Sequence, residues 1–243
     1  MKRFLVDSLE GDLATVTGDR LHHLAKVLRL RAGDEVELFD GKGGCRRGTI
    51  LALGDEEARI ELGPWREAPS RRPVTLGQAM VKSDRLELVI QKATELGVAR
   101  IVPLELARSI VRLPEGKVPE RKRRWKKIAE EAARQSGRAD VPEVESPTRL
   151  EVFLDAAAQR GEAVAILWEE AREGLRLGAW VDQHQDAPLA IVVGPEGGLT
   201  EEEVEAARAK GASVVGLGPR ILRTETAGIV ASALVLHRLG DLG

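Results

Sequence analysis

Two stretches near the C-terminus decide the fold: residues 189–200 read LAIVVGPEGGLT and residues 213–227 read SVVGLGPRILRTETA. Each begins with a short apolar run typical of a buried strand, and each ends with residues that can start a helix. Strands that alternate with helices indicate an α/β domain with a largely parallel sheet. Ligands bind beyond the carboxyl ends of the strands in such sheets, so both turns are candidate binding loops.

The same alternation extends back to Val74. We predict strands at 74–81, 98–104, 163–168, 189–193 and 213–217. We predict helices from Ser83 to Gly97, from Pro119 onward, from Thr148 to Gly161, from Thr200 to Gly211 and over 224–239. Ser83 should cap the first of these helices, and the pairs Thr148/Glu151 and Thr200/Glu203 match the capping-box pattern.

The first 62 residues have a different pattern. They contain short strand-like runs, at 3–6, 13–17, 35–39, 47–53 and 58–62, with one short helix near 20–28. Several short strands in so few residues suggest a small barrel. The polar, proline-bearing stretch 63–73 is typical of a linker. We therefore expect two domains, residues 1–72 and residues 73–243.

Composition excludes several classes of protein. Aromatic residues make up 3% of the chain and Tyr is absent, which argues against an aromatic platform for stacking bases. The single Cys excludes a disulfide framework. His22 and His23 are adjacent, so at most one can face inward, and His184 and His237 are isolated, which leads us to expect no metal site. The N-terminus lacks the apolar segment of a signal peptide, and the longest run of small and apolar residues is far below the roughly 20 that a membrane span needs. We expect a cytoplasmic protein with no membrane partner.

Other catalytic motifs fail on their spacing. The chain contains no G-x-x-x-x-G-K-[ST] phosphate loop, no G-x-S-x-G and no H-E-x-x-H. The glycines of 41–46 fit a hairpin better than a dinucleotide fingerprint, and Cys45 within it should pack as a small apolar residue.

Positive charge is concentrated in the middle of the chain. The whole chain has a net charge of −2, yet residues 73–140 hold 15 basic and 9 acidic side chains, a local excess of +6. The densest run is RKRRWKK at 121–127. Such a run suits a phosphate backbone, and it equally suits a solvated helix face.

The two turns combine close backbone approach with polar donors. Glycines at 194, 197 and 198 let the backbone come near a ligand, and the run RTET at 223–226 places donors at the start of a helix. An ordinary loop and helix cap would contain the same residue types. Two such turns after neighbouring strands favour a binding site.

The turns resemble the signature of the RsmE family, the 16S rRNA uridine-N3 methyltransferases of the SPOUT superfamily. Further similar segments are QKATELGV at 91–98, Arg108-Ser109, the stretch from Trp125 to Arg138, and HHL with VLR between 22 and 29. The resemblance covers nearly the whole chain. One departure is Leu167-Trp168-Glu169, which lacks the His/Pro form that we associate with that strand end.

The resemblance implies an α/β SPOUT-type domain with a C-terminal trefoil knot, a rare exception to the rule against knots, preceded by a small PUA-like β-barrel domain that binds RNA. It implies S-adenosylmethionine as cofactor, 16S rRNA or the small ribosomal subunit as substrate, and a homodimer. The small residues of 227–233 could form the dimer seam or pack within one chain.

The reaction that the resemblance implies also suggests roles for residues, which we state as hypotheses. Arg223 would stabilise negative charge on the uracil, and Glu225 or Glu196 would accept the N3 proton; the two carboxylates could instead only favour a helix N-terminus. The cofactor-binding residues would be Leu167, Val193, Gly194, Pro195, Gly197, Leu217, Gly218, Ile221, Leu222, Arg223, Thr224, Thr226 and Ala227. The RNA-binding residues would be Arg3, His23, Arg29, Arg108, Arg123, Arg124, Arg134 and Arg138.

Two alternatives stay open at this point. Another SPOUT enzyme, such as a ribose 2′-O methyltransferase, would share the cofactor turns. A non-catalytic RNA-binding ribosome assembly factor would keep the fold and bind no methyl donor.

Overall fold

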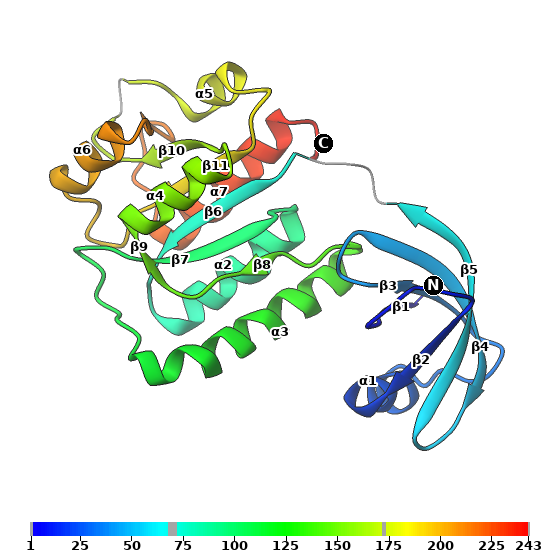
Figure 1. Ribbon diagram of the computed structural model, residues 1–243. Coiled ribbons are helices and arrows are strands. Elements are labelled where there is room, and N and C mark those ends of the chain that lie inside the picture. Colours follow the sequence, from blue (N-terminus) through cyan, green and yellow to red (C-terminus); the bar gives the residue numbers. More distant parts are fainter. Residues whose placement is uncertain (1, 68–71, 172–173, 243) are drawn as a thin grey trace. The chain divides into compact units, whose positions relative to one another are not determined.

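The computed structural model describes residues 2–67, 72–171 and 174–242. It divides into two compact units, one formed by Met1–Ser70 with Glu130–Val141 and the other by Arg71–Ala129 with Pro142–Gly243 (Figure 1). The segment Glu130–Val141, which the predicted boundary at residue 73 places in the C-terminal domain, therefore groups with the N-terminal residues.

The first unit is built on a five-stranded sheet. Its strands are β1 (Lys2–Leu5), β2 (Leu13–Thr17), β3 (Glu35–Phe39), β4 (Gly44–Leu53) and β5 (Glu57–Glu67), in the order β1-β3-β4-β5-β2. β1 pairs parallel with β3, and the other pairs are antiparallel. A short helix α1 (Gly18–His22) continues into a π-helical turn, His23–Val27. Alternate strand residues such as Val36, Leu38 and Ile60 fill the core.

The hairpin predicted at 41–46 is confirmed, because β3 and β4 pair antiparallel and the turn between Phe39 and Gly44 joins them. The linker prediction is wrong at its start, since Gly63 and Pro64 lie within β5. Pairing with β2 ends at Glu61, so beyond it β5 has a neighbour on one side only. The missing N–H of a proline is tolerated at such an open edge.

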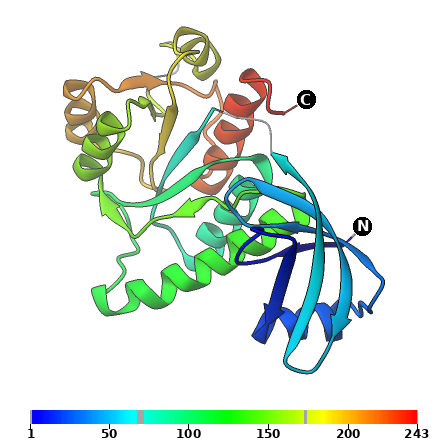
Figure 2. The same ribbon diagram turned by 45° about the vertical axis from the view of Figure 1, so that its right-hand side comes forward.

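The second unit is built on a parallel sheet of seven strands (Figure 2). The strands are β6 (Val74–Ala79), β7 (Arg100–Glu105), β8 (Glu143–Val144), β9 (Thr148–Arg149), β10 (Ala163–Leu167), β11 (Leu189–Val193) and β12 (Ser213–Val215). Their order is β12-β10-β11-β6-β7-β8, with β9 also paired to β7. The helices are α2 (Ser83–Leu96), the 3₁₀ turn Glu115–Lys117, α3 (Val118–Ser136), α4 (Leu150–Gln159), α5 (Leu177–Gln183), α6 (Glu201–Ala209) and α7 (Thr224–Arg238). α3 ends in the segment that groups with the first unit.

Helices cover the central strands. α7 packs on β6 and β11 and against α2 and α5, while α4 packs on β7 and β10 and against α6. Every residue of β6 and β11 is buried. This explains the continuous apolar sequence of β11, because a parallel strand covered on both faces has no solvent side. The two buried polar residues of β6, Thr75 and Gln78, each form a side-chain hydrogen bond.

We predict N-terminal caps for three helices, and the structure confirms one of them. The capping box of Thr200 and Glu203 is confirmed, with the Glu203 N–H donating to Thr200 Oγ1 (3.2 Å) and the Thr200 N–H donating to Glu203 Oε2 (3.0 Å). The capping box predicted for Thr148 and Glu151 is wrong. Thr148 belongs to β9 and pairs with Leu104 of β7, and Arg149 is the N-cap residue of α4. The Ser83 cap is also wrong, since α2 already includes Ser83. Helix α5 was not predicted.

The strand order brings the two candidate turns together. β12, β10 and β11 are neighbours, and all three run parallel. The residues after Leu167, Val193 and Val215 therefore meet at one edge of the sheet. Within the described ranges, no helix combines the length and apolarity required to cross a membrane.

Candidate functional site

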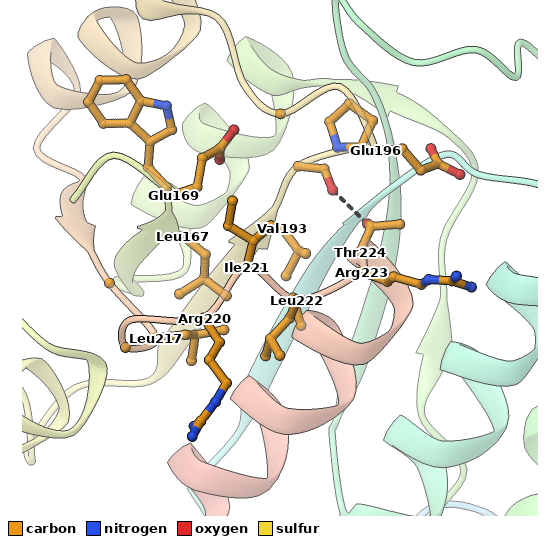
Figure 3. A pocket seen from close by; sticks show the side chains of 17 residues that line it. Leu167, Glu169, Val193, Glu196, Leu217, Arg220, Ile221, Leu222, Arg223 and Thr224 are labelled. Atoms are coloured by element: carbon orange, nitrogen blue, oxygen red, sulfur yellow. Dashed lines mark hydrogen bonds between the residues drawn. The ribbon is translucent and has the colours of Figure 1, made fainter. Parts of the chain in front are cut away.

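A cavity of about 290 Å³ lies at this edge of the sheet (Figure 3). It is lined by Leu167, Trp168, Glu169, Val193, Gly194, Pro195, Glu196, Gly198, Gly216, Leu217, Gly218, Arg220, Ile221, Leu222, Arg223, Thr224 and Ala227. The lining comes from the ends of β10, β11 and β12, from the turns that follow them, and from the first turn of α7.

The turn after β11 is held from two sides. The backbone of Gly198 has φ = +72°, a conformation that favours glycine. The Glu169 carboxylate lies where a side chain on Gly198 would have to go. On the other side, Arg108 Nη1 donates to the carbonyl oxygens of Gly197 (2.9 Å) and Leu199 (3.3 Å).

The two turns are joined by a hydrogen bond from Thr224 Oγ1 to the carbonyl oxygen of Gly194 (2.6 Å), drawn dashed in Figure 3. Thr224 is the first residue of α7, so the helix start is tied directly to the end of β11. Leu167, Val193 and Leu222 supply an apolar wall beside this bond. The cavity therefore offers apolar surface for a flat ring next to backbone polar groups.

The structure brings most of the predicted cofactor-binding residues to this cavity, and two lie outside its lining. Gly197 packs against Arg108 behind the turn. Thr226 is exposed on α7. The cavity lining gives these two predicted contacts no support, and their role in cofactor binding stays a prediction.

The residues predicted for catalysis lie at the rim. Arg223 lines the cavity, and its side chain extends toward the side of Glu196 in Figure 3. Arg85 of α2 bridges two carboxylates, with Nη1 3.1 Å from Glu196 Oε1 and Nε 3.8 Å from Glu225 Oε1. Glu225 does not line the cavity; its Oε2 atom is buried and has no hydrogen-bond partner among the described residues.

Four lining residues were not predicted to bind anything: Trp168, Glu169, Gly216 and Arg220. Trp168 and Glu169 directly follow β10, so the rule that ligands lie beyond strand ends could have found them. Gly216 and Arg220 lie within the second turn itself. In Figure 3, Glu169 extends toward the glycine turn while Arg220 points away from it.

The predicted RNA-binding residues of the first unit fall into two groups. Arg3 pairs with Glu37 (2.8 Å) and lies over the Phe39 ring, and Arg138 is nearly buried and pairs with Asp140 (2.5 Å). These contacts give both arginines a structural role.

The remaining candidates in the first unit form part of its surface. His23 contacts Arg134, and the pKa of His23 is lowered by burial and then by the positive charge of Arg134. Arg29 is exposed with φ = +52°, an uncommon conformation for a residue other than glycine. Strained backbone of this kind is found at functional sites more often than elsewhere.

In the second unit, Arg123 is exposed on α3, whereas Arg124 pairs with Glu87 (2.7 Å), which raises the pKa of Arg124. Arg108 is exposed but already donates to the glycine turn. The surface is therefore less positive than the basic run alone suggests, since Glu87 neutralises part of it.

Comparison with known proteins identifies the family. Residues 68–236 match the model of the RNA methyltransferase domain, and residues 16–63 match the RNA methyltransferase PUA domain. Ribosomal RNA small subunit methyltransferase E of Bacillus subtilis is 34% identical over 237 residues, covering 94% of this chain and 91% of that protein. The chain belongs to the ribosomal RNA small subunit methyltransferase E family.

Further relatives agree with this family. The ribosomal RNA small subunit methyltransferase E of Mycobacterium bovis is 38% identical over 96% of this chain and 90% of that protein. A crystal structure of the family member from Neisseria gonorrhoeae, bound to S-adenosyl methionine, superposes with a TM-score of 0.86 at 31% identity, covering 98% of this chain and 97% of that one. The family resemblance found in the sequence is confirmed.

Proposed function

We propose that this chain methylates N3 of a specific uridine in the 16S rRNA of the small ribosomal subunit, with S-adenosylmethionine as the methyl donor. One observation supports this most directly: the two family turns close around a single cavity at the carboxyl edge of a parallel sheet. Its relatives are named ribosomal RNA small subunit methyltransferases, and one of them binds S-adenosyl methionine.

The cavity suits the proposed donor. Its volume of about 290 Å³ lies just below the range of about 300–1,000 Å³ that is usual for ligand sites, and its lining mixes aliphatic side chains with backbone polar groups. When bound, S-adenosylmethionine supplies an electrophilic methyl group on a sulfonium. Backbone groups of Gly194, Leu217, Leu222 and Ala227 would hold its adenine and methionine parts, and Gly198 keeps side chains out of the turn.

The nucleophile needs more help than the donor. Uracil N3 becomes a good nucleophile when it loses its proton. A base that accepts this proton, or a cation that stabilises the resulting anion, would therefore assist the attack. Arg223 would stabilise charge on a uracil oxygen, since its side chain starts at the cavity rim. Glu196 or Glu225 would accept the proton, because Arg85 holds both carboxylates beside that rim.

RNA would be held by exposed cations on each unit. On the second unit these are Arg108 and Arg123; on the first unit Arg29 is exposed, and the half-buried His23 and Arg134, which contact each other, would join it. Contacts of this kind position a phosphate backbone and carry little sequence information.

We further propose that residues 1–72 act mainly in RNA binding as a PUA-like barrel, and that residues 73–243 form a SPOUT-type domain with a trefoil knot through the two turns. The protein would act in the cytoplasm as a homodimer. The exposed and half-buried apolar residues Val230, Ala233 and Leu234 of α7 support an interface between two copies.

Mass-spectrometric nucleoside analysis of rRNA from a deletion strain tests the proposal. Loss of 3-methyluridine, restored by the intact gene, is the expected result. Loss of a 2′-O-methylated nucleoside would instead identify the ribose-methylating alternative. Unchanged nucleosides, with no uptake of labelled S-adenosylmethionine by the folded protein, would support the assembly-factor alternative.

A further inference from the structure

Gln78 is a fully buried polar residue directly behind the cavity. It lies near the carboxyl end of β6, in register with Val193 of β11 and Pro103 of β7, and none of its surface is exposed. It does not line the cavity, and no sequence motif singles it out. A polar side chain in the middle of an apolar sheet requires an explanation.

Gln78 begins a chain of two hydrogen bonds that ends at the glycine turn. Its Nε2 donates to Thr224 Oγ1 (2.8 Å), and Thr224 Oγ1 donates to the carbonyl oxygen of Gly194 (2.6 Å). The carbonyl of Gly194 can only accept, so the single hydroxyl proton of Thr224 must point to it. Thr224 can then only accept from Gln78, which fixes the orientation of the Gln78 amide.

This orientation has a cost. Gln78 Oε1 is buried without a hydrogen-bond partner among the described residues, and it faces the backbone of Gly228 on α7. A side chain on Gly228 would collide with that oxygen. A buried unpaired carbonyl destabilises a fold, and an apolar residue of similar size would avoid the penalty. Stability alone therefore does not account for glutamine at this position.

We propose that Gln78 is a positioning residue of the methyl-donor cavity. By holding the Thr224 hydroxyl in one orientation, it fixes the start of α7 against the end of β11. Gly194 and Thr224 both line the cavity, so the distance between its two walls depends on this bond. The inference deepens the proposed function and rests on it.

The test compares binding of S-adenosylhomocysteine with folding stability. We expect Gln78→Leu to weaken binding at least tenfold in calorimetry, while its urea midpoint stays the same or rises. Thr224→Val should weaken binding similarly. The double variant should bind no worse than either single variant, because both changes break the same chain of bonds.

Thr75→Val is the matched control. Thr75 lies at the other end of β6, is equally buried, and donates to Glu162 Oε1 (2.6 Å). It should lose stability and bind S-adenosylhomocysteine as the unmodified chain does. Gln78→Met offers a second apolar replacement in case leucine packs poorly.

Three results would overturn the inference. The first is wild-type affinity in Gln78→Leu, and the second is additive losses in the double variant. The third is failure of both apolar variants to fold, because the amide would then be needed for the fold itself. If the unmodified chain binds no S-adenosylhomocysteine, the proposed function fails together with the inference, whereas the first two results leave that function intact.

Discussion

Comparing Gly198→Ala with a control substitution at another glycine separates the stability cost of backbone strain from the effect of cavity shape on ligand binding. Gly198 has φ = +72°, where a residue with a Cβ costs about 1–2 kcal/mol. For a chain of this size each kcal/mol lowers Tm by about 2–4 °C, so a loss of roughly 2–8 °C is expected. The new methyl group would also collide with the Glu169 carboxylate and push it from its place.

Displacement of Glu169 should affect ligand binding in addition to stability, because that side chain lines the cavity. We expect the Kd for S-adenosylhomocysteine to rise at least tenfold, which corresponds to about 1.4 kcal/mol. Isothermal titration calorimetry would give the affinity, and differential scanning fluorimetry would give Tm.

Gly161→Ala is the control for strain. Gly161 has φ = +66° in the turn after α4, and a Cβ there would meet no atom within 4 Å. It should lower Tm by a similar amount and leave the Kd unchanged. The reasoning is refuted if Gly198→Ala binds S-adenosylhomocysteine normally, or if Gly161→Ala weakens binding as much.

Four further changes test the roles of single residues. Arg223→Ala should keep its affinity for S-adenosylhomocysteine but lose well over tenfold in single-turnover rate on rRNA, as expected for loss of a donor that stabilises an anion; near-normal turnover would remove Arg223 from the mechanism. Arg123→Ala should weaken RNA binding and flatten its salt dependence by about one phosphate contact, and an unchanged slope in filter binding would contradict this. The pKa of His23 is lowered from 6.5 by burial and by Arg134, so the folded state resists protonation and urea stability should fall as pH drops below 6.5; His23→Gln should abolish that loss, and an identical pH profile would count against it. Burial raises the pKa of the Cys45 thiol above 9.0, so alkylation near pH 8 should be slow in the native protein and fast in urea.

Local patterns were predictable wherever neighbouring residues alone determine the structure. The capping box of Thr200 and Glu203 depends on two side chains and the backbone between them, and it forms as expected. The same pattern at Thr148 and Glu151 fails because Thr148 pairs with a strand more than 40 residues earlier in the chain. Strand pairing over such separations is not encoded in a short motif.

The functional site shows the same contrast between features set by neighbouring residues and features set by residues far apart in the sequence. The two glycine-bearing turns were identifiable because parallel strands end at one edge, and their residues do meet around one cavity. Gln78 was not identifiable, because its role depends on Thr224, 146 residues further along the chain. Likewise, Arg3, which the resemblance assigns to RNA, pairs with Glu37 of a neighbouring strand. Arg138 pairs with Asp140, two residues away, so that ion pair depends on local sequence only.

The central claim is that the turns after β11 and β12 form the pocket for the methyl donor. A crystal structure with S-adenosylhomocysteine tests it most directly. We predict electron density for the ligand between residues 193–198 and residues 217–224, beside Leu167. Density at any other place on the chain, or none at saturating ligand, would contradict the claim.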